Sequence, residues 1–368
     1  MPRNFAAASA TNVSAISSCS APDPSGGSVE LAGWRRKDRC TPNPQTFLAS
    51  CEWLTVSLFA SVYVGWMVLV GYHDALPFWI LLPTLAVLTT LHSSLQHEAL
   101  HGHPTRSARF NECFSATPLG LFIPYRRFKR LHLRHHCDEN LTDPYDDPES
   151  FYLARQDWAD LPFGMHVLLR ANNTLFGRLV LGPALSIFAF YRSEVTRFLK
   201  APKGRRCLTM AWALHCGGVL SVLFVLSYVE FPIWLYLLGV SYPAMSLLML
   251  RTYGEHQAAE SVGPRTAIVE ASPIFALLYL NNNLHFVHHR FPSAPWYELP
   301  NLYKSHYALL NAENGHYRIA GYWSLFRLFF VTAKEPVAHP FRRRFETVEL
   351  KPNAGSVKLD SALQTSDS

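Results

Sequence analysis

The chain has 368 residues, of which 49% are hydrophobic and only 16% are charged. Soluble domains usually contain about 25% charged residues, so this composition does not suit an ordinary soluble protein. The net charge of +6 suits an anionic surface, and because no nucleic-acid-binding motif accompanies it, we expect lipid and no nucleic acid as the partner. Seven scattered cysteines without a Cys-x-x-Cys pair argue against a disulfide framework or an iron–sulfur site.

Both ends of the chain are polar. Residues 1–45 are rich in Ser, Ala, Pro and Gly, and residues 346–368 are also polar. Because such segments bury too little apolar surface to fold, we expect two disordered tails around a membrane domain of residues 46–345, with the first tail in the cytosol. No secretory signal peptide is indicated, but the Ser/Ala bias leaves an organellar transit peptide as an alternative.

Two long apolar blocks, residues 47–105 and 207–250, contain no Lys or Arg. A helix needs about 20 apolar residues to cross a bilayer, so each block is long enough for two crossings joined by a short turn. We therefore expect an all-α integral membrane protein with four transmembrane helices, arranged as two hairpins. The predicted spans are residues 47–70, 76–96, 208–228 and 233–250.

All 33 Lys and Arg residues lie outside the two apolar blocks. The positive-inside bias therefore places both termini and the central segment in the cytosol, and both hairpin turns on the other side. We expect a bacterial inner membrane, with an organellar membrane as the alternative. Two shorter apolar stretches, residues 113–125 and 175–191, are expected to form helices at the membrane interface or packed under the cytosolic domain.

Nine of the seventeen histidines gather in four short stretches next to the predicted cytosolic ends of the spans. Histidines at positions i and i+4 share one helix face, and the i, i+3, i+4 spacing of two of the stretches again clusters the imidazoles. The nine are His97 and His101; His132, His135 and His136; His256; and His285, His288 and His289. The other eight histidines are expected to be packing or surface residues.

Nine imidazoles are about enough for two metal ions, with coordination positions left for oxygen. A structural zinc site is closed by four ligands, so a single zinc site would leave most of these histidines unused. Imidazole binds zinc, copper, iron and nickel alike, so the ligand type alone does not identify the metal.

The clusters resemble the three histidine boxes of the membrane fatty-acid desaturase family, which occur in this order around two transmembrane hairpins. The segments His97–His101, His132–His136 and His285–His289 match the boxes, and His256 matches an extra histidine that often follows the last span. The Pro-x-x-Pro-aromatic sequence at 292–296 is also similar to the family. The resemblance covers about residues 50–340.

Two positions depart from the family pattern. Glu98 stands where Asp often follows the first histidine, and Thr252 stands where some acyl-CoA desaturases have a metal-facing Asn. The second departure weakens any assignment to that subgroup. Similar boxes also serve carotenoid ketolases and hydroxylases, lipid hydroxylases and alkane hydroxylases, so the resemblance indicates the chemistry better than the product.

The resemblance implies an O2-dependent oxidoreductase that holds two ferrous ions and oxidises an unactivated C–H bond of a lipid acyl chain. Removal of a second, vicinal hydrogen would make the enzyme a fatty-acid (acyl-lipid) desaturase. Carotenoid ketolation or hydroxylation, or lipid hydroxylation, is the alternative. A membrane metal-binding or transport protein is disfavoured because the clusters lie beyond the predicted span ends.

Carboxylates near the boxes are expected to orient the imidazoles through their other ring nitrogen. The candidates are Glu98, Asp138, Asp143, Asp147 and Glu255. Four basic residues before the second box are candidates for binding a lipid headgroup or an acidic electron donor, namely Arg126, Arg127, Lys129 and Arg130. Because the chain has no iron–sulfur, fused-cytochrome or flavin motif, we expect a separate electron donor of the ferredoxin or rubredoxin type.

Overall fold

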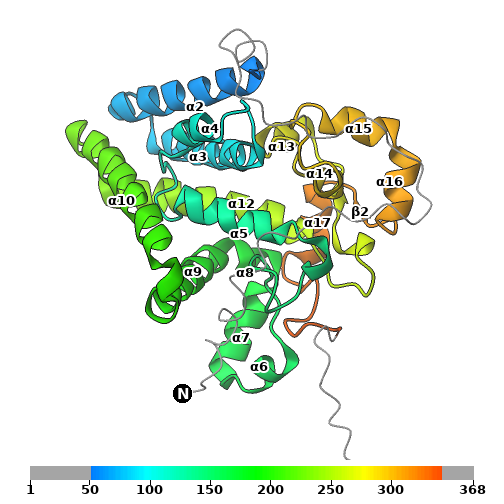
Figure 1. Cartoon of the computed structure of the whole chain (residues 1–368). Helices are drawn as coiled ribbons and strands as arrows, with labels where there is room; N and C mark the ends of the chain where they lie inside the picture. Colours follow the sequence, from blue (N-terminus) through cyan, green and yellow to red (C-terminus); the bar gives the residue numbers. More distant parts are fainter. Residues whose placement is uncertain (1–50, 342–368) are drawn as a thin grey trace, which may run out of the picture.

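The computed structural model describes residues 51–341, and these residues form an almost entirely helical protein (Figure 1). The only strands in this range, β1 (Ile268–Val269) and β2 (Arg318–Ile319), pair in parallel. The all-α prediction is therefore confirmed. The predicted tails, residues 1–45 and 346–368, fall outside the described residues, so the predicted domain limits remain a prediction.

Four helices are long and apolar enough to cross a membrane, as the sequence predicts. They are α2 (Trp53–Gly71), α3 (Phe78–His101), α10 (Arg205–Tyr228) and the continuous segment Ile233–Glu255, which consists of α11 (Ile233–Tyr236), a π-helical turn η5 (Leu237–Ser241) and α12 (Tyr242–Glu255). α2 begins at Trp53 rather than at residue 47, and α10 begins at Arg205 rather than at residue 208. The other two extend past their predicted ends. α3 continues to His101 rather than ending at residue 96, and α12 continues to Glu255 rather than 250. The first histidine pair therefore belongs to a membrane helix.

The apolar helices pack against one another on one side and leave apolar side chains exposed on the other. α2 packs on α3, and α3 packs on α12. The indole N–H of Trp66 on α2 donates to the hydroxyl of Tyr236 on α11 at 2.8 Å, which joins the two hairpins inside the core. Val64, Leu220 and Leu238 are exposed on three of these helices. An apolar outer face of this kind suits contact with lipid.

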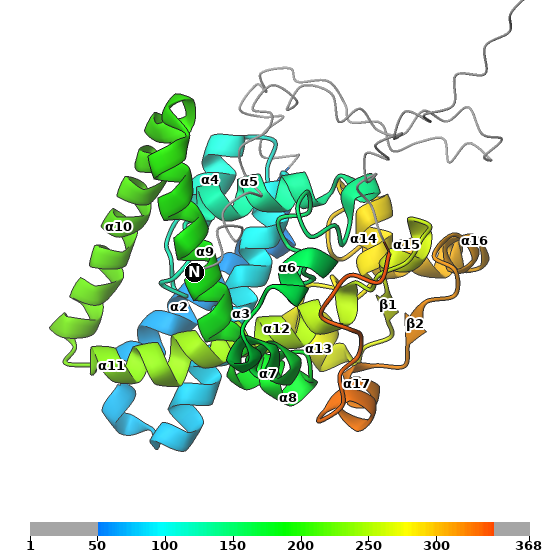
Figure 2. The ribbon, with the colours of Figure 1, turned by 90° about the horizontal axis from the view of Figure 1, so that it is seen from below.

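Shorter helices form the rest of the structure. They are α4 (Ala108–Ser115), α5 (Tyr125–His135), α6 (Arg155–Ala159), α7 (Phe163–Asn172), α8 (Leu175–Val180), α9 (Gly182–Lys200), α13 (Pro273–Leu278), α14 (His285–Arg290), α15 (Leu299–Ser305), α16 (Tyr307–Glu313) and α17 (Tyr322–Phe329), with 3-10 turns η2 (His73–Ala75), η3 (Asp138–Asn140), η4 (Pro202–Gly204) and η6 (Gly263–Arg265). In both views α14–α16 lie on the side of the molecule opposite α10 (Figures 1 and 2).

The expectation of a helix over residues 113–125 is wrong. α4 ends at Ser115 and α5 begins at Tyr125, with a loop between them. Pro118 and Pro124 account for this, because proline has no N–H to donate and disfavours helical backbone in the residue before it. Residues 175–191 are helical, as expected, but they divide between α8 and α9, and neither is among the candidate spans.

A buried ion pair joins α5 to α9. The guanidinium of Arg127 donates to both carboxylate oxygens of Glu194 at 2.7 Å, and the indole N–H of Trp212 donates to one of them at 3.0 Å. The side chains of Arg127 and Glu194 are only 4% and 5% exposed, respectively. Because both charges are almost removed from water, each would be strongly unfavourable without the opposite charge beside it.

Replacing Glu194 with Gln should therefore destabilise the protein by about 3–5 kcal/mol, since it leaves a buried guanidinium without its counter-charge. The measurement is chemical or thermal unfolding in detergent, compared with Arg127→Met and with the double variant. The double variant should lose less stability than the sum of the losses in the two single variants, because it removes both charges. Additive losses would contradict this account.

Candidate metal centre

Four chain segments bring the predicted histidines together at the ends of helices. α3 carries His97 and His101 in its last turns and is followed by Gly102, whose φ of 107° is the left-handed backbone that glycine adopts readily. α5 and the residue after it carry the second box, and α14 carries the third. His256 follows the last residue of α12.

All nine predicted histidines lie in two compact groups, and no predicted member lies outside them. The first group is His97, His101, His132, His136 and His288, and the second group is His135, His256, His285 and His289. Within each group the ring nitrogens that could hold an ion lie within 4.8 Å of one another. The groups are neighbours, because the rings of His136 and His289 stack with their centroids 4.2 Å apart.

The second and third boxes each divide between the two groups. In both boxes the i and i+4 histidines join one group, and the i+3 histidine joins the other. A helix turns about 100° per residue, so positions i and i+4 lie about 40° apart around the axis, whereas i+3 and i+4 lie about 100° apart. The i+3 side chain therefore points to the neighbouring group.

Hydrogen bonds at Nδ1 determine which ring nitrogen of these histidines is free to bind an ion. The Nδ1 atoms of His132, His135 and His285 lie 2.9 Å from a Glu149 oxygen, 2.8 Å from an Asp147 oxygen and 3.0 Å from the Asn282 amide oxygen, respectively. Each partner atom accepts hydrogen bonds only, so each Nδ1 carries the proton. The Nε2 atom of a neutral ring then presents a lone pair, as a metal ligand must.

These Nε2 atoms face one another at short range. In the first group the Nε2 atom of His132 lies 2.9 Å from that of His97 and 3.0 Å from that of His136. In the second group the Nε2 atom of His256 lies 3.0 Å from those of His135 and His285.

Nδ1 of His256 lies 3.2 Å from the Arg265 carbonyl, so it also carries the proton. The Nε2 lone pairs of His256 and His285 therefore face each other without a hydrogen bond. In addition, the buried Nε2 atom of His101 has no hydrogen-bond partner. A cation at the centre of each group would satisfy these nitrogens, so the residues fit a pair of metal ions.

Comparison with known proteins agrees with this geometry. The family model described as fatty acid desaturase matches residues 74–321. The chain belongs to the fatty acid desaturase family. No curated protein matches the chain. The matched region contains all nine clustered histidines, so the family predicted from the boxes is confirmed, and the chain is a multi-pass, desaturase-like membrane oxidoreductase.

The predicted supporting carboxylates of this desaturase-family site differ in their contacts. Asp147 holds His135, as described above. One Glu98 oxygen lies 3.9 Å from Nδ1 of His97, and the other accepts the backbone N–H of Trp296. One Glu255 oxygen lies 3.4 Å from Nδ1 of His285 and 2.7 Å from Nε of Arg251. The orienting roles of these residues remain predictions.

The two other predicted carboxylates, Asp138 and Asp143, belong to the acidic run 138–149. Asp143 accepts the backbone N–H groups of Tyr145 and Asp146, so it closes a turn of the acidic loop rather than holding a ring. The side chain of Asp138 lies outside the part of the molecule that the structure describes.

Sequence reasoning missed two side chains that hold ring nitrogens. Glu149 is the last residue of the acidic run 138–149, and nothing in the run distinguishes it from its neighbours. Asn282 stands in the triplet Asn281–Asn283 just before the third box, and this run of amides next to the box is a signal that could indicate it. Its amide nitrogen also lies 3.5 Å from Nε2 of His97. His92 and His103 flank the first box, but they lie outside both groups.

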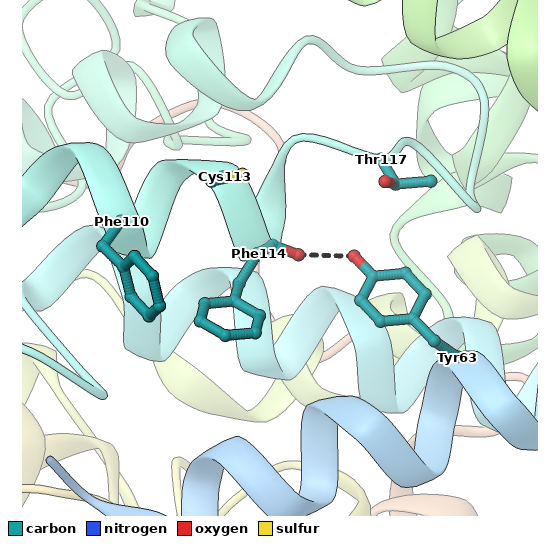
Figure 3. Close-up of a pocket in the computed structure, with 5 residues that line it drawn as sticks. All are labelled: Tyr63, Phe110, Cys113, Phe114 and Thr117. Carbon is teal, nitrogen blue, oxygen red and sulfur yellow. Dashed lines mark hydrogen bonds between the residues drawn. The ribbon is translucent and has the colours of Figure 1, made fainter. Parts of the chain in front are cut away.

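A small cavity of about 160 Å³ lies between α2, α4 and the loop that follows α4 (Figure 3). It is lined by Tyr63, Phe110, Cys113, Phe114 and Thr117. The Tyr63 hydroxyl donates to the Phe114 carbonyl at 2.5 Å and lies 2.9 Å from Nε2 of His92. Ligand pockets usually enclose about 300–1,000 Å³, so this cavity is too small for a long acyl chain, and we assign no substrate to it.

The clustered histidines outside the membrane helices differ in charge. Burial lowers the pKa of His132, His136, His256, His285 and His288, so these rings are neutral at pH 7. Burial would also lower the pKa of His135, but the nearby carboxylates of Glu149 and Asp147 outweigh it and raise that pKa to about 9. At pH 7 the metal-free protein therefore keeps a proton on His135, and a metal ion must displace it.

We accordingly expect metal binding by the second group to release a proton and to weaken as pH falls. Below pH 9 the apparent affinity should decrease by about tenfold for each pH unit, because the metal-free state holds one more proton than the metal-bound state. Cobalt(II) titration of the His97→Ala/His288→Ala variant, in which the first group is disabled, measures this at pH 6.5, 7.5 and 8.5. An affinity that does not change over this range would contradict the assignment.

Proposed function

We propose that this chain is a di-iron, O2-dependent fatty-acid desaturase that acts on acyl lipids, with the nine clustered histidines as its metal ligands. The observation that carries the proposal is the pair of buried histidine groups whose Nε2 lone pairs converge. Five imidazoles for one ion and four for the other leave few oxygen ligands from the protein, which suits iron better than magnesium or calcium.

The protein side chains in this proposal bind and orient, and they do not act as acids or bases. A bound pair of ferrous ions supplies the O2-activating redox chemistry that no side chain provides. Glu149, Asp147 and Asn282 fix the tautomer and direction of three ligand rings. Desaturation removes two vicinal hydrogens, and O2 is reduced to two waters with two further electrons and protons from a donor.

Two rival functions lead to different products. Hydroxylation or ketolation of a lipid or carotenoid would use the same histidines but add oxygen to the product. Metal transport would favour ionisable groups near the middle of the spans, whereas the two groups here lie at the ends of α3 and α12. A transporter would also form no oxidised lipid.

Expression in one host that makes only fatty acids, and in another that also makes carotenoids, separates these functions. Mass analysis of both lipid pools should show an O2-dependent loss of two hydrogens from an acyl chain. The purified protein should contain iron. A gain of one oxygen would indicate hydroxylation instead.

Removing one ligand from either group should abolish this activity, because each group needs its imidazoles. His288→Ala tests the first group and His135→Ala the second, and each should reduce product formation by at least about a hundredfold. His316→Asn is the matched control, since His316 is exposed, lies outside both groups and has a positive φ of 61° that Asn tolerates. Full turnover in either ligand variant would overturn the proposal.

The orientation and the electron donor are part of the same proposal. Arg205 and Arg206 precede the apolar part of α10, and the positive-inside bias supports a cytosolic location for this end and for the histidine groups. We propose that a separate acidic donor of the ferredoxin or rubredoxin type docks on α5. Arg126, Arg130 and Arg134 are exposed on one face of this helix, at i, i+4 and i+8, while its buried face carries His132 and His135.

One of the basic residues expected to bind a partner is not accessible. Arg127 is buried against Glu194 and therefore holds α5 to α9 rather than facing a donor. Arg126 pairs with Glu112, which is partly exposed. Arg134 lies 3.9 Å from a carboxylate oxygen of Asp146, but both side chains are exposed. Arg130 and Arg134 are therefore the sharper test of docking.

Reversing both charges, as Arg130→Glu with Arg134→Glu, should raise the KM for an acidic donor by about tenfold or more at low salt and leave kcat nearly unchanged. The difference from the unmodified protein should shrink as salt is added. Arg327→Glu, an exposed charge reversal on α17, is the control. An unchanged KM for the donor would exclude this face as the docking site.

A further inference from the structure

A short segment near the end of the described chain, residues 333–341, lies against the second histidine group. We call it the C-terminal strap. It follows α17 and lies beyond residue 321, where the match to the desaturase family model ends. Two isolated bridges fasten it, one between Ala333 and Thr174 and the other between Ala338 and Leu153. The strap is therefore attached to the rest of the protein on both sides of residues 334 and 335.

Lys334 of the strap binds the backbone that carries His256. Its ammonium donates to the carbonyl of His256 at 2.7 Å and to the carbonyl of Tyr253 at 3.0 Å. The last carbonyls of a helix have no partner within the helix, and a cation there also interacts favourably with the helix dipole. Lys334 therefore closes the end of α12 at the point where the chain leaves the helix as His256.

Glu335 holds the next turn of the same segment. One of its carboxylate oxygens accepts the backbone N–H of Ala258 at 3.0 Å, and the other accepts the hydroxyl of Tyr152. The Tyr152 oxygen in turn accepts the same Ala258 N–H at 2.8 Å. The backbone on both sides of His256 is therefore fixed by adjacent residues of the strap.

His339 connects the strap to a second ligand of the same group. Its Nε2 atom lies 3.3 Å from the hydroxyl of Thr142, and the backbone N–H of Thr142 donates to Asp147 at 2.9 Å. Asp147 in turn holds Nδ1 of His135. The contacts of the strap thus lead to His256 directly and to His135 through Asp147.

We propose that the C-terminal strap positions the second histidine group for metal binding, with Lys334 as its principal positioning residue. This inference rests on the proposed function, because it takes the two groups to be ion sites. It adds a residue outside the region that matches the family. Without the Lys334 ammonium, the His256 carbonyl and the end of α12 lose this partner. The position of His256 then depends only on its contacts with Arg265 and Thr266.

The test measures metal content rather than turnover. Lys334→Met keeps an apolar stem of similar length and removes the ammonium. In purified full-length protein equilibrated with limiting cobalt(II), this variant should hold about one ion per chain where the unmodified protein holds about two. Lys334→Arg should restore most of the second ion, since a guanidinium also donates to two carbonyls. Lys304→Met, an exposed lysine on α15, is the matched control and should keep two.

Double variants identify which ion is lost. Lys334→Met added to His256→Ala/His289→Ala, which disables the second group, should cause no further loss of cobalt. Added to His97→Ala/His288→Ala, which disables the first group, it should remove the remaining ion. If Lys334→Met does not fold, Glu335→Gln is measured in the same way and should also lose the second ion selectively.

Two outcomes would overturn the proposal. One is retention of both ions in folded Lys334→Met protein, and the other is loss of cobalt from the first group instead of the second. Failure of the unmodified protein to bind two ions is a different result, because it would overturn the proposed function itself. An unmodified protein that binds two ions but oxidises no lipid would overturn the proposed oxidation of lipids. The role of the strap in metal binding would still be decided by the cobalt measurements.

Discussion

Nitrogen lone pairs that point at one another inside a protein repel unless a cation lies between them. In this chain Nδ1 of His132, His135 and His285 faces an acceptor, so each of these rings, in its neutral form, directs an Nε2 lone pair inward. The other parts of the site hold the histidine rings in these positions. The ends of α3 and α12, two helices that pack together, carry or precede ligands, and the acidic loop supplies acceptors, so that the histidines converge where water is largely excluded.

Much of this architecture follows from the sequence. Apolar length and the absence of Lys and Arg identify the four spans, because a membrane helix must satisfy its backbone internally and bury no unpaired charge. The spacing of the boxes identifies eight of the nine clustered histidines, and its place just after the fourth span identifies His256. Helix ends were harder to place, since α3 and α12 remain helical beyond the apolar residues that reveal them.

The roles of several other side chains depend on tertiary contacts that the sequence alone does not reveal. Glu149 and Asp143 both belong to one acidic run, and only the fold of the loop decides that Glu149 faces His132 whereas Asp143 closes a turn. Arg127 resembles its basic neighbours in sequence, yet it is buried against Glu194. Lys334 carries no motif at all, because its partners are backbone carbonyls that any residue type would supply.

The division of the second and third boxes between the two groups has a consequence for how the protein is made. His288 belongs to the first group, while His285 and His289 belong to the second. A ribosome reaches these residues only after all four membrane helices have been synthesised. A nascent chain that ends before α14 therefore lacks a histidine of each group, so neither group can be completed early. Metal binding at the proposed sites would come late, after both hairpins are available for insertion.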